Sequence, residues 1–255
     1  MNVVVLSKYI PNPTGTPELG EDFLVKREGV EGGLDPGDEY AVEAALQIAE
    51  KAGAEVTVVS MGPEPATAAV RKALSMGCAK AILVTDAALR GSDAWVTARV
   101  LAKAVERAGF DLVVAGVEST DGSTGTLPMT LAGLLDVPSL TFARKVDVTN
   151  GTLTVERQTE SGYDVVECPL PALVTVTAGA VEPRYPTLKG IMQAKQKPVD
   201  QVSLSDLGLS ADDAKATQRV TGIQHAAERG AGEIVEDETE GAARIAQLLQ
   251  QAKVI

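Results

Sequence analysis

A glycine- and hydroxyl-rich stretch near the middle of the chain carries the residues best suited to binding a ligand. It spans residues 116–125 and reads GVESTDGSTG. A short β-branched apolar run at residues 112–115 precedes it and has the length of a buried strand, and a helical pattern follows up to residue 137. Such a junction suits phosphate, because the first amides of a helix lack internal acceptors and lie at the positive end of the helix dipole.

The composition of this loop limits the ligand that it would hold. It contains no Lys or Arg, so backbone amides and hydroxyls would bind the phosphate, which favours a monoester over a triphosphate. The spacing matches neither the P-loop nor the GxGxxG pattern. A purely structural interpretation is equally open, in which Ser123 or Thr124 caps the following helix.

The segments around the loop predict the fold that positions it. Apolar strands alternate with amphipathic helices along the first half of the chain. Strands are expected at residues 2–7, 55–60, 80–85 and 111–115, and helices at residues 40–51, 65–76 and 93–108. The alternation predicts an α/β fold with a doubly wound, mostly parallel sheet of the Rossmann-like type. Ligands of such sheets bind outside the carboxyl ends of the strands, where this loop lies.

Two regions depart from the alternation. Residues 8–38 form a connection without clear periodicity, and connections of this length are usually functional or disordered. It contains one alternating piece at residues 23–27 that is suited to a hairpin, and it ends in Asp35 and Asp38, for which helix capping is the structural interpretation. Further on, residues 146–166 read as a hairpin appended to the sheet, and residues 172–177 as a strand that returns to the core.

Composition argues against several classes of function. A formal net charge of -12 argues against nucleic acid and anionic membrane surfaces as partners. The chain has no run of membrane-spanning length and no leader-like start, so a cytoplasmic protein is expected. Cys78 and Cys168 read as reduced core residues. The one histidine, His225, cannot build a metal cluster and reads as solvated, so a bound cofactor would have to supply any redox chemistry.

The carboxy-terminal part has two features that the α/β core does not need. Residues 182–199 form a basic segment in an acidic protein, with three apolar side chains at helical spacing. Residues 200–238 are polar and weakly patterned, and an amphipathic helix is expected at residues 239–252. We therefore expect an α/β domain over residues 1–199 and an extended arm over residues 200–255 that packs on a partner, with disorder as the competing interpretation.

Motifs along essentially the whole chain resemble the β subunit of electron transfer flavoprotein. The combination is more specific than any single loop motif would be. The matching motifs are VLSK at 5–8, Asp35-Pro36 before a helix, SMGP at 60–63, RKALSMG at 71–77, ARVLA at 98–102, DGSTG at 121–125 and, most specifically, EPRYPTLKGIMQAK at 182–195.

The resemblance implies an electron-carrier subunit that is not an enzyme by itself. The family's β subunit pairs with a larger α subunit that holds most of the FAD. The heterodimer carries electrons from dehydrogenases, such as acyl-CoA dehydrogenases, to a membrane quinone oxidoreductase. Most members also bind a buried, structural AMP. The cofactor-binding residues that the resemblance implies here are Leu6, Asp35, Pro36, Gly37, Asp38, Met61, Gly116, Val117, Asp121, Gly122, Ser123, Thr124 and Gly125.

The basic segment is similar to the family's recognition loop, which docks the dehydrogenase. Leu188 matches the leucine that inserts into a pocket of that partner, and an exposed apolar side chain with a charged rim suits such docking. Ile191 and Met192 are expected to pack on the core side of the same short helix. The partner-binding residues that the resemblance implies are Arg184, Tyr185, Leu188, Lys189, Ile191, Met192 and Lys195.

Two other functions stay open from the sequence. One is an electron-bifurcating relative, in which a second FAD takes the place of AMP. The other is a stand-alone adenine-nucleotide sensor of the universal-stress type, which shares the sheet and the glycine-rich loop but leaves the 182–195 motif and the arm unexplained. An enzyme that uses Asp35 and Asp121 would lack a positioned base or metal.

Overall fold

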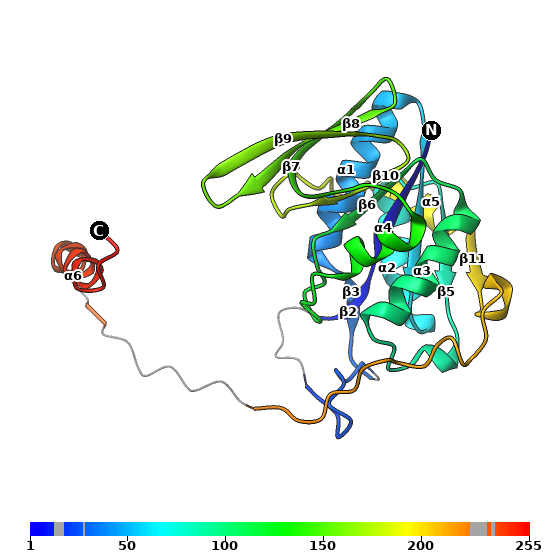
Figure 1. Cartoon of the computed structure of the whole chain (residues 1–255), viewed down its shortest axis with the longest axis horizontal. Helices are drawn as coiled ribbons and strands as arrows, with labels where there is room; N and C mark the ends of the chain where they lie inside the picture. The colour runs from blue at the N-terminus through cyan, green and yellow to red at the C-terminus, as the bar shows by residue number, and fades with distance from the viewer. Residues whose placement is uncertain (13–17, 28, 225–233, 236–237) are drawn as a thin grey trace. The chain divides into compact units, whose positions relative to one another are not determined.

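A nine-stranded sheet forms the centre of the computed structural model, which describes residues 1–12, 18–27, 29–224, 234–235 and 238–255 (Figure 1). The strand order is β11-β5-β4-β1-β6-β10-β7-β8-β9. All pairs from β11 to β7 are parallel, and β7, β8 and β9 are antiparallel. The strands are β1 (Asn2–Ser7), β4 (Glu55–Met61), β5 (Lys80–Val84), β6 (Leu112–Gly116), β7 (Ser139–Thr149), β8 (Thr152–Thr159), β9 (Gly162–Pro169), β10 (Ala172–Val176) and β11 (Val199–Val202).

Helices cover both faces of the parallel part of the sheet. Helices α1 (Pro36–Ala52) and α2 (Thr67–Met76) pack on one face, and α3 (Ala94–Ala108) and α4 (Leu127–Leu135) pack on the other. Short 3-10 turns lie at Glu64–Ala66, Ala87–Leu89 and Ser205–Leu207. This arrangement confirms the predicted doubly wound α/β fold.

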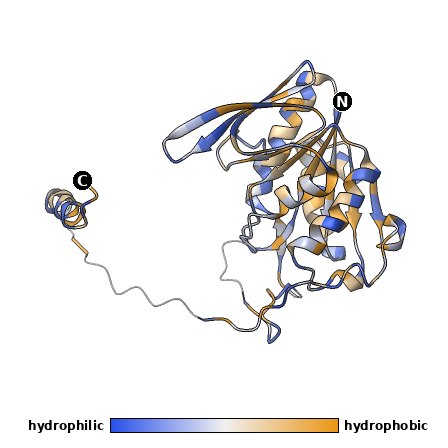
Figure 2. Cartoon of the chain, viewed as in Figure 1, coloured by the Kyte–Doolittle hydropathy of each residue, from blue (hydrophilic) through white to orange (hydrophobic). Residues whose placement is uncertain are grey.

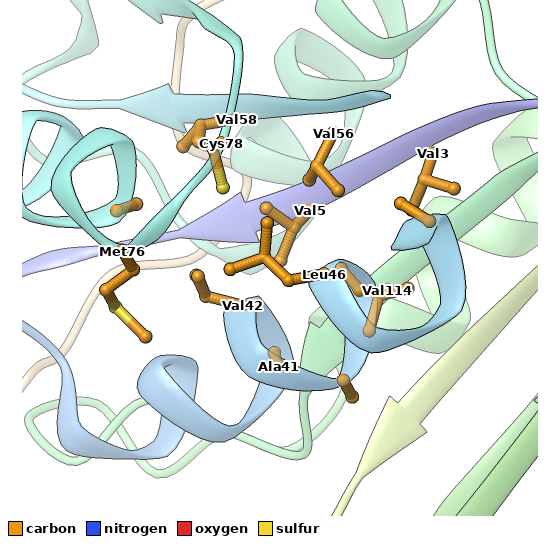
Figure 3. Close-up of a cluster of buried hydrophobic side chains, with 14 of the residues drawn as sticks. Val3, Val5, Ala41, Val42, Leu46, Val56, Val58, Met76, Cys78 and Val114 are labelled. Carbon is orange, nitrogen blue, oxygen red and sulfur yellow. The ribbon is translucent and has the colours of Figure 1, made fainter. Parts of the chain in front are cut away.

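The central strand β1 shows why the sheet needs helices on both sides. Val3 and Val5 point into the core under α1 and α2, whereas Val4 and Leu6 belong to the core under α3. Successive side chains of a strand alternate between faces, so an uninterrupted apolar strand must be buried twice. Figure 3 shows the first of these cores, where Val5 and side chains of α1, including Val42, point toward one another. Figure 2 shows the hydrophobic residues concentrated in this parallel part of the sheet.

The strand order changes direction at β1, which makes the carboxyl end of this strand a topological switch point. The chain passes from β1 to β4 and β5 on one side, and then crosses back to β6 on the other side of β1. The connections that leave the carboxyl ends of β1 and β6 therefore diverge, and ligands of other doubly wound sheets bind at such a switch point.

The described residues of the long first connection form more regular structure than their composition indicates. A small antiparallel pair, β2 (Tyr9–Pro11) and β3 (Gly32–Leu34), joins its two ends, and Leu19 bridges to Val25 inside it. That bridge agrees with a hairpin around residues 23–27. The first helix begins at Pro36, earlier than the expected residue 40, because Asp35 caps it and proline is well suited to the first helical turn.

The second half of the chain differs from the expectation in one element. Residues 146–166, predicted as a hairpin appended to the sheet, belong to a three-stranded meander whose first strand, β7, pairs in parallel with β10 of the main sheet. Alternation along these half-exposed strands reveals a sheet edge, but it does not show where each strand ends. Cys78 lies in the core and Cys168 packs against it, and both are free.

The chain divides into two compact units, Met1–Thr221 and Gly222–Ile255. The first unit extends past residue 199, where the change of pattern placed the boundary, because β11 pairs with β5 and Val202, Leu204 and Ala214 are buried. The second unit contains α6 (Glu238–Gln251), close to the helix expected at residues 239–252. His225 lies outside the described residues. None of the described helices has the length and apolar character needed to cross a membrane.

Candidate functional site

The start of α1 holds the glycine-rich loop in place at the carboxyl edge of the sheet. Asp35 is fully buried and caps α1, accepting a hydrogen bond from the Gly37 amide at 2.8 Å. Its carboxylate also accepts bonds from the Thr120 amide at 2.7 Å and from Thr120 Oγ1 at 2.8 Å. The expected capping role of Asp35 is therefore confirmed, and the same side chain joins the loop to the helix.

Asp38 has a different role from the capping that the sequence indicated. It lies inside α1, is almost fully buried, and accepts a hydrogen bond from the Lys8 amide at 2.7 Å. Burial, followed by the neighbouring charge of Asp35, raises the pKa of Asp38 to about 8. The carboxyl group is therefore mostly protonated at neutral pH and adds little negative charge to the site.

Two basic side chains converge on the loop from outside it. The Lys8 ammonium pairs with Asp121 Oδ1 at 2.6 Å and donates to Ser119 Oγ at 3.0 Å. The guanidinium of Arg27, from the long first connection, pairs with the other oxygen of Asp121. Burial alone would raise the pKa of Asp121, but Lys8 and Arg27 outweigh it and lower that pKa below its ordinary value.

Two glycines of the loop region allow close contact that a side chain would prevent. A Cβ atom on Gly116 would lie 3.0 Å from Asp38 Oδ1, and one on Gly122 would lie 3.0 Å from Ser119 Oγ and 3.5 Å from the Lys8 ammonium. The backbone of the loop therefore lies directly against the acidic and basic groups described above. Gly125 adopts a φ of +60°, which glycine tolerates best.

The capping interpretation of the loop is wrong. Helix α4 begins at Leu127, later than a Ser123 or Thr124 cap requires, and its cap residue Thr126 makes no side-chain capping bond. Ser123 instead adopts a φ of 46° within the turn. The first amides of α4 thus lack a side-chain cap, and amides of this kind are suited to an anion.

Three buried polar atoms near this edge have no hydrogen-bond partner among the described residues. They are Ser7 Oγ at the end of β1, Thr67 Oγ1 at the start of α2, and Arg27 Nη1 beside Asp121. A buried polar group without a partner costs roughly 1–3 kcal/mol, so each needs an explanation. A bound polar ligand at the carboxyl ends of β1 and β4 would provide one. The donor set therefore fits a nucleotide.

The structure brings most of the expected cofactor residues together, because β1, β4, β6, the start of α1 and the loop end at the same edge. Asp35, Pro36, Gly37 and Asp38 meet the loop that holds Gly116, Val117, Asp121, Gly122, Ser123, Thr124 and Gly125. Leu6 and Met61 lie at the ends of β1 and β4. The side chain of Leu6 is buried in the core, which leaves only its backbone for a ligand.

Several residues of this edge escaped the sequence-based reasoning. They are Lys8, Arg27 and Thr67. A signal existed for Lys8, since a basic residue that directly follows a buried strand is placed at the ligand-binding edge. Arg27 ends the short alternating piece at residues 23–27, and no pattern connects it to a residue 94 positions further along the chain.

The basic segment presents an apolar surface to solvent. Tyr185, Leu188 and Met192 are 90%, 76% and 63% exposed, and Ile191 is exposed as well. Leu188 and Met192 line an open groove with Lys189, Gln193 and Gln196 along α5 (Leu188–Ala194). The expectation that Ile191 and Met192 pack on the core is wrong, because Ala194 and Gly190 form the inner side of this helix.

Arg184 fixes the beginning of this segment on α1. Its side chain donates to Glu43 Oε2 at 2.7 Å and to Glu43 Oε1 at 3.0 Å, and it also reaches Glu50 at 2.5 Å. Burial would raise the pKa of Glu43, but the bonds from Arg184 and Gln47 outweigh it and lower that pKa. We call this group the Arg184 clamp. The side chain of Arg184 is therefore directed at its own chain, whereas Lys189 and Lys195 are exposed.

A second set of contacts fixes the end of the segment on α2. Arg71 Nη1 donates to the carbonyls of Ala194 and Lys197 at 2.5 and 2.7 Å. In return, Lys197 Nζ donates to the carbonyls of Leu74 and Cys78 at 2.9 and 2.6 Å. Each helix end thus supplies carbonyls that a basic side chain of the other segment satisfies. Helix α5 is therefore held at both ends while its apolar side chains stay exposed.

The chain is similar to known proteins along its whole length. The model of the electron transfer flavoprotein domain matches residues 22–207. The chain is 42% identical over 264 residues to electron transfer flavoprotein subunit beta of Mycobacterium tuberculosis, covering 100% of this chain and 99% of that protein. It is 36% identical over 258 residues to electron transfer flavoprotein subunit beta of Bacillus subtilis, with 100% of both chains covered.

A further relative, from Acetobacterium woodii, is caffeyl-CoA reductase-Etf complex subunit CarD. It is 36% identical over 214 residues, which cover 83% of this chain and 82% of that protein. Because the family model spans most of the chain and the identities extend over its whole length, the chain belongs to the electron transfer flavoprotein β-subunit family.

Proposed function

We propose that this chain is the β subunit of a heterodimeric electron transfer flavoprotein that works in the cytoplasm. In this proposal a larger α subunit holds most of the FAD, and the heterodimer takes electrons from dehydrogenases, such as acyl-CoA dehydrogenases, and passes them to a membrane quinone oxidoreductase. The chain itself is a carrier subunit and has no catalytic residues. Its family membership and the pairing of a nucleotide-type edge with an exposed, firmly held helix support this function.

The observation that carries the proposal is the carboxyl edge of the sheet. There the loop at residues 116–125 lies against the capped start of α1, next to buried donors that have no partner among the described residues. We propose that this edge holds AMP. The residues that would hold it are the start of α1, the ends of β1 and β4, and the loop. The FAD, when bound, supplies the redox chemistry of the complex.

The remaining part of the function is docking. We propose that Leu188 inserts into an apolar pocket of the dehydrogenase, with Tyr185, Ile191 and Met192 around it and Lys189 and Lys195 at the rim. A small apolar contact of this kind provides affinity at its centre, and the charged rim steers the encounter. In this arrangement Arg184 supports the segment from behind rather than extending toward the partner.

One relative gives the alternative a specific basis. The protein from Acetobacterium woodii is named as a subunit of a caffeyl-CoA reductase-Etf complex, which is a setting other than a general electron carrier. The second candidate is therefore a bifurcating relative, in which a second FAD takes the place of AMP at the edge of this sheet. The stand-alone stress-type sensor is less well supported, because the family model and the identities extend through the docking segment.

Nucleotide content separates these functions. The chain would be co-expressed with its α subunit, and the purified complex would be denatured so that chromatography and mass spectrometry identify the released nucleotides. We expect one FAD and one AMP for each heterodimer. Two FAD molecules would favour the bifurcating alternative, and a chain that forms no complex but binds adenine nucleotide alone would favour the sensor.

A further inference from the structure

The loop at residues 116–125, which we call the nucleotide loop after its proposed ligand, lacks a basic residue of its own, but the fold supplies two from elsewhere. Lys8 and Arg27 meet at Asp121, whose side chain is only 4% exposed. These three side chains come from the end of β1, the long first connection and the loop itself. We call them the Lys8–Asp121–Arg27 cluster. One cation is enough to neutralise the charge of a buried carboxylate. The presence of the second cation therefore needs an explanation.

The unsatisfied donor of Arg27 points to a ligand. Its Nη2 atom is used by Asp121, whereas its Nη1 atom is buried and has no acceptor among the described residues. Guanidinium groups bind phosphate strongly because their N–H donors form charge-assisted hydrogen bonds with phosphate oxygens. A Cβ atom on Gly122 would lie 3.5 Å from the Lys8 ammonium, and Lys8 also donates to Ser119 Oγ, so both cations border the loop that presents its amides.

We propose that Lys8 and Arg27 bind the phosphate group of the adenine nucleotide, and that Asp121 holds the two cations in position before the nucleotide arrives. This inference rests on the function proposed above. It supplies the positive charge that the loop sequence lacks, and it makes the long first connection part of the nucleotide site. Arg27 and Lys8 are then binding residues, and Asp121 is a positioning residue.

The charge of the cluster also indicates which nucleotide fits best. Two positive side chains and one negative side chain leave a single positive charge. Asp35 contacts the loop at Thr120, and Glu118 Oε2 would be 3.4 Å from a Cβ atom on Gly125, so two further carboxylates border the loop. A monophosphate carries less negative charge into this setting than a diphosphate or triphosphate. The site should therefore prefer AMP over ADP and ATP.

The test uses the complete heterodimer, freed of nucleotide by denaturation and refolded with FAD. Calorimetric titration with AMP and with adenosine separates contacts to the phosphate from contacts to the nucleoside. For Arg27→Gln and Lys8→Met we expect the Kd for AMP to rise about tenfold or more, as for the loss of a charge-assisted hydrogen bond, with the Kd for adenosine unchanged. Arg27→Lys keeps the charge and should recover part of the AMP affinity.

Lys26→Gln is the matched control, because Lys26 is the neighbouring cation and pairs with Glu18 at the surface. Equal loss of AMP and adenosine affinity in Arg27→Gln and Lys8→Met would overturn the inference and make the cluster a support for the loop fold. Undiminished AMP binding in both variants would also overturn it. Failure of the unaltered complex to bind AMP would instead overturn the proposed nucleotide site itself, and the inference with it.

Discussion

Asp38 is buried beside a second carboxylate, Asp35, and this pair sets the electrostatics at the start of α1. Because the pKa of Asp38 is about 8, its carboxyl group keeps a proton at neutral pH. A protonated carboxyl group is a donor as well as an acceptor. It can therefore accept a hydrogen bond from the Lys8 amide and lie close to Gly116, and it does not repel an anion at the loop.

The raised pKa predicts how stability depends on pH. The ordinary value of 3.8 applies in the unfolded chain, so between about pH 4 and pH 8 the folded state binds the proton more strongly. The stabilisation that Asp38 contributes is complete below about pH 4 and is lost as the pH rises to about 8. In Asp38→Asn this titration is absent. As the pH rises from about 4 to about 8, the free energy of unfolding of the variant should therefore increase relative to that of the unaltered protein. The relative increase should be up to about 1.4 kcal/mol per pH unit.

Denaturant titrations of the purified protein at about pH 5, 6, 7 and 8 measure this difference. Asp22→Asn is a suitable control, because Asp22 is an exposed carboxylate that pairs with Arg90 at the surface. Parallel pH profiles for Asp38→Asn and the unaltered protein would mean that Asp38 is charged in the folded state. The picture of a nearly uncharged Asp38 beside the nucleotide loop would then be wrong.

At the scale of elements, α5 is held by other helices rather than by its own length. It has only seven residues, and a helix this short is unstable alone in water. The Arg184 clamp holds its approach on α1, and Arg71 and Lys197 connect its end to α2. A Cβ atom on Gly190 would lie 2.6 Å from the Ser75 carbonyl, so the helix also packs tightly at its centre.

Because α5 is held from behind, loss of its exposed anchor should affect docking and not folding. We expect Leu188→Ala to change the free energy of unfolding by less than about 0.5 kcal/mol, since Leu188 is 76% exposed. In the complex, KM for electron uptake from an acyl-CoA dehydrogenase should rise several-fold, with FAD content unchanged. Val165→Ala is the matched control, because Val165 is similarly exposed but lies on β9. A loss of stability with unchanged uptake would show that Leu188 serves the fold.

The elements that could be predicted from the sequence are those with a strong periodic pattern. Val3 to Leu6 are apolar at every position, which only a sheet buried on both faces accommodates, and the glycines of the loop mark a turn at its edge. β11 could not be predicted in this way. It is an edge strand whose residues Asp200 and Gln201 face solvent, so it has neither an apolar run nor a clear alternation.

The charged contacts of the site could not be predicted from the sequence pattern. Lys8 and Asp121 are 113 residues apart, and Arg184 and Glu43 are 141 apart, so only the folded register brings them together. For Leu188, Ile191 and Met192, helical spacing identified a common face but not what this face contacts. A face made of apolar residues looks the same in sequence whether it contacts the core or a partner.

At the scale of the main unit, the nucleotide loop lies at the carboxyl ends of the parallel strands, and α5 lies toward their amino ends. The loop follows the carboxyl end of β6, whereas α5 packs against the carboxyl end of α2, which leads into the amino end of β5. Helix α2 has ten residues and is about 15 Å long, which indicates the scale of this separation. A docked electron donor would thus lie away from the proposed nucleotide site. This separation is what we expect if the proposed nucleotide is structural and the α subunit carries the redox flavin.

The last prediction concerns α6 of the second unit, which exposes an apolar side. Exposure of an apolar helix side to water is unfavourable, so a packing partner is expected. Ile245, Leu248 and Leu249 are exposed and follow helical spacing on one side of α6. We expect this side to pack on the α subunit. Leu248→Asp should then weaken heterodimer formation at least about tenfold in analytical ultracentrifugation, because a carboxylate would be buried without a partner.

Gln247→Asp is the matched control for that measurement, since Gln247 adds the same charge on the opposite side of α6 and should leave association unchanged. Thermal unfolding of each variant chain alone shows whether α6 packs on its own chain or on the α subunit. If Leu248→Asp lowers the unfolding temperature of the chain but leaves its association with the α subunit intact, α6 packs on its own chain. If association falls while the unfolding temperature holds, the apolar side of α6 belongs to the heterodimer interface, and the fold of residues 1–221 does not depend on it.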